Sequence, residues 1–456
     1  MEKNKKILGE DPIRDIRELP IGKTLLLGLQ HLFAMFGATI LVPLLTGLDV
    51  STTLLGAGVG TLLFHLITKG QVPAFLGSSF AFLGGYAAVA PMLDGQPNVE
   101  MLPYAGGGVV ASGIVYIILA LFIRSFGVRR VMRFFPPVVT GPIIVCIGLI
   151  LAPSAIRNAQ TDWLLAGVAM AAVIYFNIWG KGMAKIIPIM LGILISYGLA
   201  IALDRVDFSL MHSARFFAVP LHPEAFAKFD ISAVITIMPI ALATIMEHIG
   251  DISAIGATTG QNYIRTPGLH RTLIGDGIAT SLASFFGGPA NTTYGENTGV
   301  LVLTRVYDPR VMQIAAGFAI LLSFFPAVSV LIRAIPAAII GGVSLILYGM
   351  ISSIGVRNVV ENQVDFTKSR NLIVAASIFV CALGFSAPDI NGISFTIAGA
   401  PVNLSSLAIA ALVGILMNAI LPGKDYHFDE GSPPDTGVDF SASFTKKEGK
   451  GTPNES

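Results

Sequence analysis

The sequence predicts a polytopic helical membrane protein with fourteen membrane-spanning segments. Of its 456 residues, 53% are hydrophobic and only 12% are charged, whereas ordinary soluble domains carry about 25% charged residues. The mean hydropathy is +0.74, and apolar runs recur along almost the whole chain. A run of about 20 apolar residues is long enough to cross a bilayer as a helix. The dominant solvent of this chain is therefore lipid.

The apolar runs divide into two sets of seven, and several of them are shorter than a full crossing. A polar loop at 204–230 separates the two sets. Residues 1–23 are polar and charged, so we expect a cytoplasmic segment without a cleavable signal peptide. Residues 423–456 are rich in Gly, Pro, Ser and charge and are predicted to be disordered. The runs lie near 24–46, 51–68, 75–92, 104–124, 136–153, 162–179 and 186–203, then near 231–249, 271–287, 289–304, 311–332, 336–353, 371–386 and 404–421.

The basic residues give an independent test of this topology. If the N-terminus is cytoplasmic, the predicted cytoplasmic segments contain every Lys and Arg except Arg157, Arg205, Arg215, Lys228 and Arg333. Cytoplasmic loops of membrane proteins carry an excess of Lys and Arg. The pattern therefore predicts an even number of spans, with both termini in the cytoplasm.

Several function classes have little support in the sequence. The net charge of +1 argues against a nucleic-acid partner. Cys146 and Cys381 both lie in apolar runs, so neither a disulfide framework nor a thiolate metal cluster is available. We find no nucleophile with a base, no Gly-rich nucleotide loop and no His/Cys metal spacing. We therefore expect no metal, no cofactor and no enzymatic activity.

The two sets of runs resemble each other in their prolines and glycines. Arg133, Pro136 and Gly141 open the fifth run, and Arg333, Pro336 and Gly341 open the twelfth at a constant offset of 200. The third and tenth runs open with the same Pro-Ala pair, followed by small polar residues. Together these matches predict a seven-plus-seven repeat. Because seven is odd, the second half would cross the membrane in the opposite direction, which is the plan of secondary transporters.

The tenth run contains the residues best suited to a working site. It reads PANTTYGENTGVLVLTR at 289–305 and places Glu296 after a Pro, several small polar residues and Gly295. Broken backbone survives at membrane depth only where protein covers it or where it lines a wet cavity. A helix that begins at Glu296 would direct free N–H groups into such a cavity. The third run offers the same arrangement around Ser79 and Phe80.

A second candidate site lies in the eighth run, within ALATIMEHIGD. Glu247 and Asp251 are four residues apart, so a helix places both carboxylates on one face. If both are buried and ionised they repel each other, and we expect one of them to bind a proton near neutral pH. An alternative places Asp251 at the membrane edge, solvated and inert. His248 points about 100° away from Glu247, so we expect a packing or interfacial role for it.

These stretches resemble the nucleobase–cation symporter-2 family, also called nucleobase–ascorbate transporters. The matching motifs are QHLFAMFGATILVP at 30–43, PAFLGSSFAF at 73–82, EHIGD at 247–251 and GENTGVLVLTR at 295–305. They occur in the family's order, and the resemblance extends over roughly residues 20 to 421. Within the family, QHLFAMFG, GSSFAF and NTTYGEN are most similar to bacterial uracil permeases.

The resemblance implies a core domain that moves against a gate domain. Short antiparallel strands in segments 3 and 10 would hold the ligand between them, and a homodimer would form through the gate domains in the cell membrane. The implied divisions are 1–23, a cytoplasmic segment; 24–124, core; 125–203, gate; 204–230, an extracellular loop; 231–333, core; 334–422, gate; and 423–456, a cytoplasmic tail.

The resemblance also implies roles for individual residues in proton-coupled uracil import. Glu247 and Glu296 would accept hydrogen bonds from the ring N–H groups of uracil, and the backbone N–H groups of Phe80 and Gly295 would donate to its carbonyls. Protons would be the coupling ion. Further residues would line the pocket or take part in proton coupling: Ala38, Ser79 and Tyr294 for the first role, and Asp251 and Tyr348, with the two glutamates, for the second.

Three alternatives remain open at this stage. The first is a xanthine or guanine symporter. Such a protein shares every motif except Glu296, where purine-transporting members of the family typically carry glutamine. Some uracil permeases carry histidine in place of Asp251, which leaves the proton-releasing group open. An anion transporter of the same architecture would require cationic groups in the site rather than carboxylates. A membrane-bound enzyme is the most distant alternative.

Overall fold

The architecture comes from a computed structural model of the chain. The structure describes residues 12–93, 96–208, 216–387, 389–390, 392–397 and 400–423, and of residues 296, 397 and 400–402 it describes the backbone only. Apart from Gly423, the predicted disordered tail lies outside these residues, as do residues 1–11 of the predicted cytoplasmic N-terminal segment.

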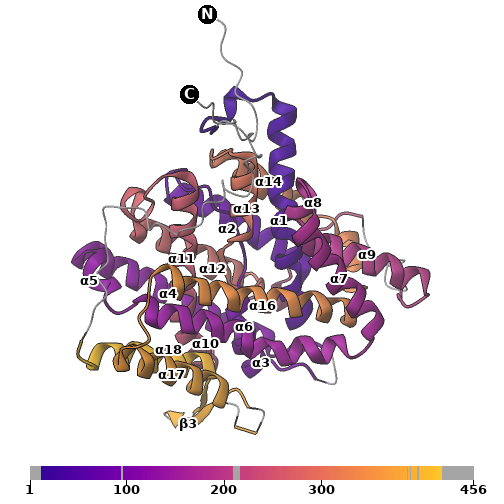
Figure 1. Cartoon of the computed structure of the whole chain (residues 1–456). Helices are drawn as coiled ribbons and strands as arrows, with labels where there is room; N and C mark the ends of the chain where they lie inside the picture. The colour runs from indigo at the N-terminus through magenta and orange to yellow at the C-terminus, as the bar shows by residue number, and fades with distance from the viewer. Residues whose placement is uncertain are drawn as a thin grey trace, which may run out of the picture.

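The first half of the chain is a series of helices interrupted by one short strand (Figure 1). Its α-helices and strand are α1 Ile21–Thr46, α2 Val50–Ile67, β1 Leu76–Ser78, α3 Leu83–Val89, α4 Leu102–Phe126, α5 Val128–Met132, α6 Pro137–Ala159, α7 Trp163–Trp179, α8 Met183–Ile186 and α9 Pro188–Ala202. A 3₁₀ turn, Phe80–Phe82, connects β1 to α3.

The second half repeats the insertion of one short strand and adds a hairpin near its end. Its elements are α10 Ile231–Ile237, α11 Ala241–Thr259, α12 Leu269–Phe285, β2 Asn291–Thr293, α13 Glu296–Thr304, α14 Arg310–Ser323, α15 Pro326–Arg333, α16 Ala337–Glu361, α17 Ser369–Gly384, β3 Ile393–Ile397, β4 Ala400–Leu404 and α18 Ser406–Ile420. The antiparallel pair β3–β4 was not predicted from the sequence.

Side-chain caps account for several helix starts. Asp49, Asp162 and Asp230 precede α2, α7 and α10, and the carboxylate of each accepts a hydrogen bond from a backbone N–H in the first turn. Ser405 caps α18 in the same way. Such caps satisfy N–H groups that have no partner within the helix. The polar residues between the apolar runs therefore fix where these helices begin.

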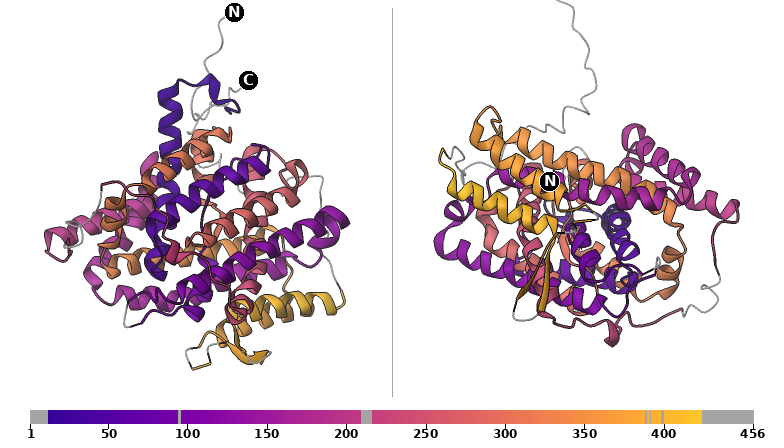
Figure 2. Two further views of the ribbon diagram at one scale, coloured as in Figure 1. Left: turned by 180° about the vertical axis from the view of Figure 1, so that it is seen from behind. Right: turned by 90° about the horizontal axis from the view of Figure 1, so that it is seen from below.

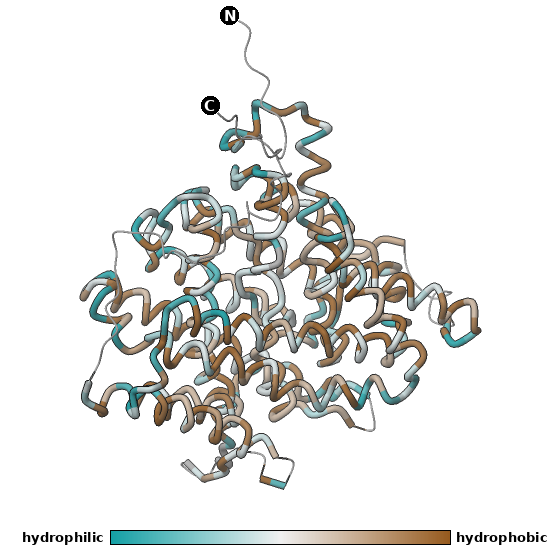
Figure 3. The backbone as a smooth tube through the Cα atoms, viewed as in Figure 1, coloured by the Kyte–Doolittle hydropathy of each residue, from teal (hydrophilic) through white to brown (hydrophobic). Residues whose placement is uncertain are grey.

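Helix length gives a lower number of full crossings than the sequence predicts. In the described part of the chain, six helices are long and apolar enough to span a membrane, and α14 with α15 makes a seventh if this pair, bent by 84°, is one span. Five shorter apolar helices of 10–17 residues accompany them. Hydrophobic residues dominate the long helices, and hydrophilic ones gather near helix ends and loops (Figure 3). The count of fourteen segments remains a prediction.

The helices pack into two groups, seen from two further directions in Figure 2. One group contains α1, α2, α4, α10, α12 and α14; the other contains α6, α7, α9, α16, α17 and α18. Contacts between the groups are fewer and include α1 with α9, α11 with α6 and α18, and α10 with β4. The division into core and gate domains remains a prediction.

Glycines allow α6 and α16 to lie close together. A Cβ at Gly141 of α6 would collide with α16 near Gly355, and one at Gly341 of α16 would collide with α6 near Ala155. The two contacts are related by the offset of 200, because position 141 corresponds to 341 and position 155 corresponds to 355. The paired helices of the predicted repeat therefore exchange equivalent contacts, whereas the full seven-plus-seven repeat remains a prediction.

The described N-terminal segment packs beside the end of α13. Ile13 N–H donates to Arg305 O at 2.9 Å, and Tyr307 N–H donates to Ile13 O at 2.8 Å. Ile16 N–H donates to the Asp308 carboxylate at 2.7 Å. Ile13 and Ile16 are buried with Leu27, Val306 and Val311 in a small apolar cluster of their own. The segment before the first helix is thus joined to residues almost 300 positions later.

Candidate functional site

The strands β1 and β2 pair antiparallel where the two interrupted segments meet. Leu76 lies opposite Thr293, and Ser78 lies opposite Asn291. The pairing continues at both ends, because Ser79 N–H donates to Ala290 O at 2.9 Å and Tyr294 N–H donates to Phe75 O at 3.0 Å. Every residue of both strands is buried. The two segments singled out by the sequence therefore contact each other inside the protein.

Polar side chains from the surrounding helices hold β1 in place. Thr61 of α2 accepts a hydrogen bond from Leu76 N–H at 2.9 Å. The Ser78 hydroxyl donates to the carbonyl of Thr39, in α1, at 3.0 Å. These contacts satisfy backbone groups that would otherwise be exposed to an apolar environment.

The strand β2 is held by the same kind of contact. Thr280 of α12 donates to Asn291 O at 2.8 Å, and the Asn291 side chain donates to Gly56 O, in α2, at 3.0 Å. The small polar residues of both interrupted segments thus have a structural role, since they allow non-helical backbone to exist within a helical membrane protein.

A helix begins directly after each strand. The 3₁₀ turn that leads into α3 starts at Phe80, and α13 starts at Glu296 with Gly295 at its N-cap position. The first N–H groups of a helix have no partner within it. The start positions thus match the sequence expectation, with one helix leaving each end of the strand pair. The side chain of Glu296 lies outside the described part of the structure.

The predicted carboxylates of α11 lie beside this strand pair. Glu247 and Asp251 are both half-buried, and the Thr293 hydroxyl of β2 donates to Asp251 Oδ2 at 3.2 Å. A Cβ built at Gly295 would lie 3.3 Å from Asp251 Oδ1. Asp251 therefore adjoins the start of α13.

The predicted pocket-lining residues are buried around the strands. Ala38 and Ser79 are buried, and the Ser79 hydroxyl has no hydrogen-bond partner among the described residues. The Tyr294 hydroxyl donates to Ser78 O at 2.8 Å, and its ring lies where a side chain at Gly77 would have to go. Tyr294 therefore fastens β2 to β1, a structural role that the sequence did not predict.

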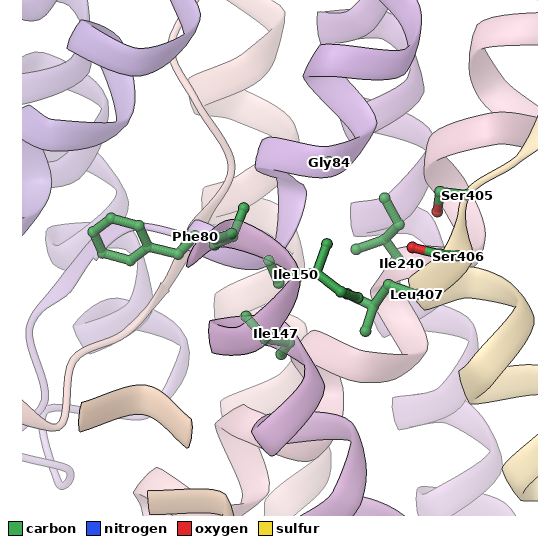
Figure 4. A pocket seen from close by; sticks show the side chains of 10 residues that line it. Phe80, Gly84, Ile147, Ile150, Ile240, Ser405, Ser406 and Leu407 are labelled. Carbon is green, nitrogen blue, oxygen red and sulfur yellow. The ribbon is translucent and has the colours of Figure 1, made fainter. Parts of the chain in front are cut away.

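Phe80 and Tyr348 meet across the boundary between the two helix groups. Their rings contact edge to face at a centroid distance of 6.1 Å. Phe80 also borders a small, largely apolar cavity. In Figure 4 its ring points away from Ser405 and Ser406 on the far side of that cavity. The lining residues, which include neither Glu247 nor Asp251, are Phe80, Ala81, Gly84, Ile147, Ile150, Leu151, Ile240, Ser405, Ser406 and Leu407.

The sequence analysis missed a buried ionisable residue, Asp276 of α12. Its carboxylate lies 3.0 Å from His248 Nδ1, and both side chains are fully buried. The same nitrogen lies 3.4 Å from the Thr293 hydroxyl, which itself donates to Asp251. Asp276 is an acidic residue within a predicted span, a signal that by itself marks a candidate functional position. His248 is a packed, buried residue that faces this carboxylate.

Metal binding has no support in the described residues, which contain no group of three or more His, Cys, Asp or Glu side chains able to hold an ion. The chemistry of the site consists instead of carboxylates, helix starts and small hydroxyl groups. Such a site suits a neutral, planar, hydrogen-bonding ligand or a proton.

Several apolar helices long enough to span a membrane, with buried strands between them, are the features of a multi-pass membrane protein. A family model described as "Permease family" matches residues 22–390. The chain belongs to this family, the nucleobase–cation symporter-2 family. The match confirms the resemblance that the motifs predicted.

Curated relatives match almost end to end. The chain is 42% identical over 427 residues to a uracil permease of Bacillus caldolyticus, covering 91% of this chain and 95% of the relative. It is 40% identical over 411 residues to a uracil permease of Bacillus subtilis (strain 168), covering 86% and 91%. A uracil permease of Escherichia coli (strain K12) is 37% identical over 413 residues, covering 88% and 92%.

Solved structures of more distant transporters share the fold. The transmembrane domain of a cyanobacterial bicarbonate transporter, BicA, gives a TM-score of 0.58 at 14% identity and covers 90% of this chain and 99% of that domain. SLC26A9 gives 0.63 at 13% identity and covers 89% and 66%. At such identities the likeness concerns architecture alone.

Proposed function

We propose that this permease imports uracil together with protons across the cell membrane. The observation that carries the proposal is the pairing of β1 with β2, with a helix start after each strand and the acidic helix α11 alongside. The relatives named uracil permeases, about 40% identical over most of the chain, support the choice of substrate.

The chemistry of uracil matches the proposed ligand groups. Uracil presents two ring N–H donors and two carbonyl acceptors. Ionised carboxylates of Glu247 and Glu296 accept from the N–H groups, and the backbone N–H groups of Phe80 and Gly295 donate to the carbonyls. Xanthine also presents an acceptor edge, which an ionised carboxylate cannot serve. A glutamate at 296 therefore favours uracil over a purine.

Proton coupling is assigned to Glu247, Asp251 and Glu296, with Tyr348 acting through its contact with Phe80. Glu247 and Asp251 lie on one face of α11, and Thr293 donates to Asp251. Binding a proton at this face removes a negative charge from an apolar environment. A proton held by one carboxylate leaves its neighbour ionised to accept from uracil, so we propose that the proton and uracil favour each other's binding.

Transport would proceed by movement of the strand-bearing core against the gate. We assign the core and the gate to the two helix groups. The contacts between the groups are fewer than the contacts within them, which suits relative motion. We further propose that both termini are cytoplasmic, consistent with the distribution of Lys and Arg, and that two copies associate through the gate domains.

The decisive experiment is uptake of labelled uracil into cells that lack their own uracil transport, with and without a protonophore. We expect saturable uptake that the protonophore abolishes, and competition by unlabelled uracil but not by xanthine or guanine. Uptake that is unchanged by the protonophore would contradict proton symport. Stronger competition by a purine would indicate that a purine is the substrate. Flux of sulfate or bicarbonate would indicate an anion transporter.

A paired substitution tests the proposed ligand residue. Glu296→Gln replaces an acceptor oxygen with a donor, and loss of one charged hydrogen bond corresponds to roughly a tenfold or greater loss of uracil uptake at low substrate concentration. Glu224→Gln, at an exposed position in the polar loop, is the matched control. Normal uptake by Glu296→Gln, at wild-type abundance in the membrane, would exclude Glu296 as a ligand.

A further inference from the structure

A basic cluster lies where α4, α5 and α12 meet, away from the strand pair. We define it as Arg124 at the end of α4, Arg129 and Arg130 of α5, Arg133 after α5, and Arg271 at the start of α12. The first four are exposed and Arg271 is half-buried. Figure 1 shows α5 beyond the end of α4, at one edge of the molecule.

No member of the basic cluster has an acidic partner among the residues that the structure describes. The sequence contains no Asp or Glu between Glu100 and Asp162, or between Asp251 and Asp276. None of the five guanidinium groups forms an ion pair or a side-chain hydrogen bond within the described part of the chain.

Several other arginines of this protein are paired. Arg17 contacts Asp15, Arg357 contacts Glu361 at 3.4 Å, and Arg333, the predicted repeat counterpart of Arg133, contacts Asp49 at 3.2 Å. The five guanidinium groups of the basic cluster differ from these paired arginines. A bound anion would offset their mutual repulsion.

The basic cluster is one site rather than scattered charges. Helices α4 and α12 pack along each other, and His270 lies close enough to both Arg124 and Arg271 to interact electrostatically with each. Arg129 and Arg130 project from a short helix whose Val131 and Met132 are buried. That burial fixes the position of the two arginines.

Exposed aromatic rings flank the basic cluster. Phe122 and Phe126 stack on each other at 5.8 Å and are 50% and 53% exposed, and Phe134 is 48% exposed. Rings beside arginines on a membrane protein match the boundary at which acyl chains give way to headgroups.

We propose that the basic cluster binds the phosphate headgroup of an anionic phospholipid, with its acyl chains against Phe122, Phe126 and Phe134. Cytoplasmic loops of membrane proteins are enriched in Lys and Arg, which explains why arginines occur at the end of α4 and in α5. This enrichment does not explain why carboxylates are missing from these segments or why exposed rings adjoin the arginines. Arg–phosphate contacts are strong and often bidentate, so the unpaired groups suit this ligand.

A lipid bound at the basic cluster would lie at the connection between the two helix groups. The helix α5 joins α4 of one helix group to α6 of the other. A headgroup held by Arg124, Arg129 and Arg130 therefore attaches the connection between the two groups to the membrane surface. The binding itself does not depend on the proposed uracil transport.

The test is native mass spectrometry of the full-length protein released from nanodiscs that contain phosphatidylglycerol and phosphatidylcholine in equal amounts. We expect the wild type to retain phosphatidylglycerol selectively. The triple variant Arg124→Gln, Arg129→Gln, Arg130→Gln should lose it, because each basic residue near an anionic surface contributes roughly fivefold in affinity, or about a hundredfold for three.

Two further variants make the result specific. The charge-matched control Arg157→Gln, Arg205→Gln, Lys228→Gln removes three positive charges far along the chain and should retain the lipid, as should Arg129→Lys, Arg130→Lys. Equal retention of phosphatidylglycerol by the cluster variant, or of phosphatidylcholine by the wild type, would overturn the proposal. Retention of inorganic phosphate offered without lipid would overturn the choice of a lipid.

Discussion

At the scale of single residues, the contact between His248 and Asp276 shows how this protein treats charge inside an apolar core. Both side chains are fully buried and 3.0 Å apart, and Phe64 lies edge-on to the His248 ring at 6.4 Å. Burying an ionisable group is expensive unless a partner compensates for the lost water. Each of these residues is thus the other's main compensation.

We expect His248→Ala to destabilise the protein by about 3 kcal/mol, because removing one member of a buried pair leaves the other charge unsatisfied. The measurement is the thermal unfolding midpoint of the purified protein in detergent. The control His222→Ala lies in the exposed loop before α10 and should change stability by less than about 0.5 kcal/mol. Equal midpoints for the two variants would show that the buried pair is not stabilising.

Sequence predicted the residues of the candidate site only where their types are rare in membrane-spanning segments. Glu247, Asp251 and Gly295 were found because acids and helix breakers stand out in apolar runs, and Asp251 does lie beside Gly295. Asp276 has the same signal but no motif around it. The contact of Phe80 with Tyr348 depends on how two helix groups pack, and no local pattern contains that information.

At the scale of elements, the interrupted segments are the part of the fold that the sequence describes best. Prolines and small polar residues predicted broken backbone, and β1 and β2 occupy those stretches. The hairpin β3–β4 was missed because residues 386–404 lie between two apolar runs, although Ile393–Ile397 alternates apolar and polar residues as a strand does. The 84° bend between α14 and α15 falls at Pro326, inside what the sequence suggested was one span.

The close packing of α6 against α16 gives a prediction about glycine. A Cβ at Gly341 would collide with the backbone of Ala159 and Ala155, whereas a Cβ at Gly349 of the same helix would meet nothing within 4 Å. We expect Gly341→Ala to lower stability by about 1–3 kcal/mol through overpacking. Gly349→Ala should leave stability equal or raise it by up to about 1 kcal/mol. Thermal unfolding of both variants decides, and a harmless Gly341→Ala would contradict the packing described.

At the scale of the whole molecule, the important feature is that two helix groups touch along a limited boundary. Gly37 of α1 faces Ile189 of α9 across it, and a Cβ at Gly37 would lie 3.2 Å from Ile189 Cβ. Gly28 of α1 faces Ile314 of α14 within one group, with a corresponding separation of 3.0 Å. Both separations are near the spacing of about 3.5–4.5 Å found in disulfides.

If transport requires movement between the groups, the two disulfides should have opposite effects. We expect the double variant Gly37→Cys, Ile189→Cys to lose uracil uptake when its disulfide is formed, and to regain uptake when a reductant breaks the disulfide. Oxidised Gly28→Cys, Ile314→Cys should transport in both states, because it links helices that move together. The four single variants control for the substitutions and for the native Cys146 and Cys381. Full uptake by the cross-linked Gly37–Ile189 pair would contradict the proposed movement.

The contacts of the described N-terminal segment have a consequence for the order in which this protein is made. Ile13 and Ile16 are synthesised early, yet their hydrogen-bond partners Arg305, Tyr307 and Asp308 follow α13, the thirteenth α-helix of the described part of the chain. Until then the segment has nothing to dock on, and α13 cannot be fastened at its far end. Docking of the chain's beginning therefore belongs among the late steps of biogenesis, after the membrane-embedded strands have a place to pair.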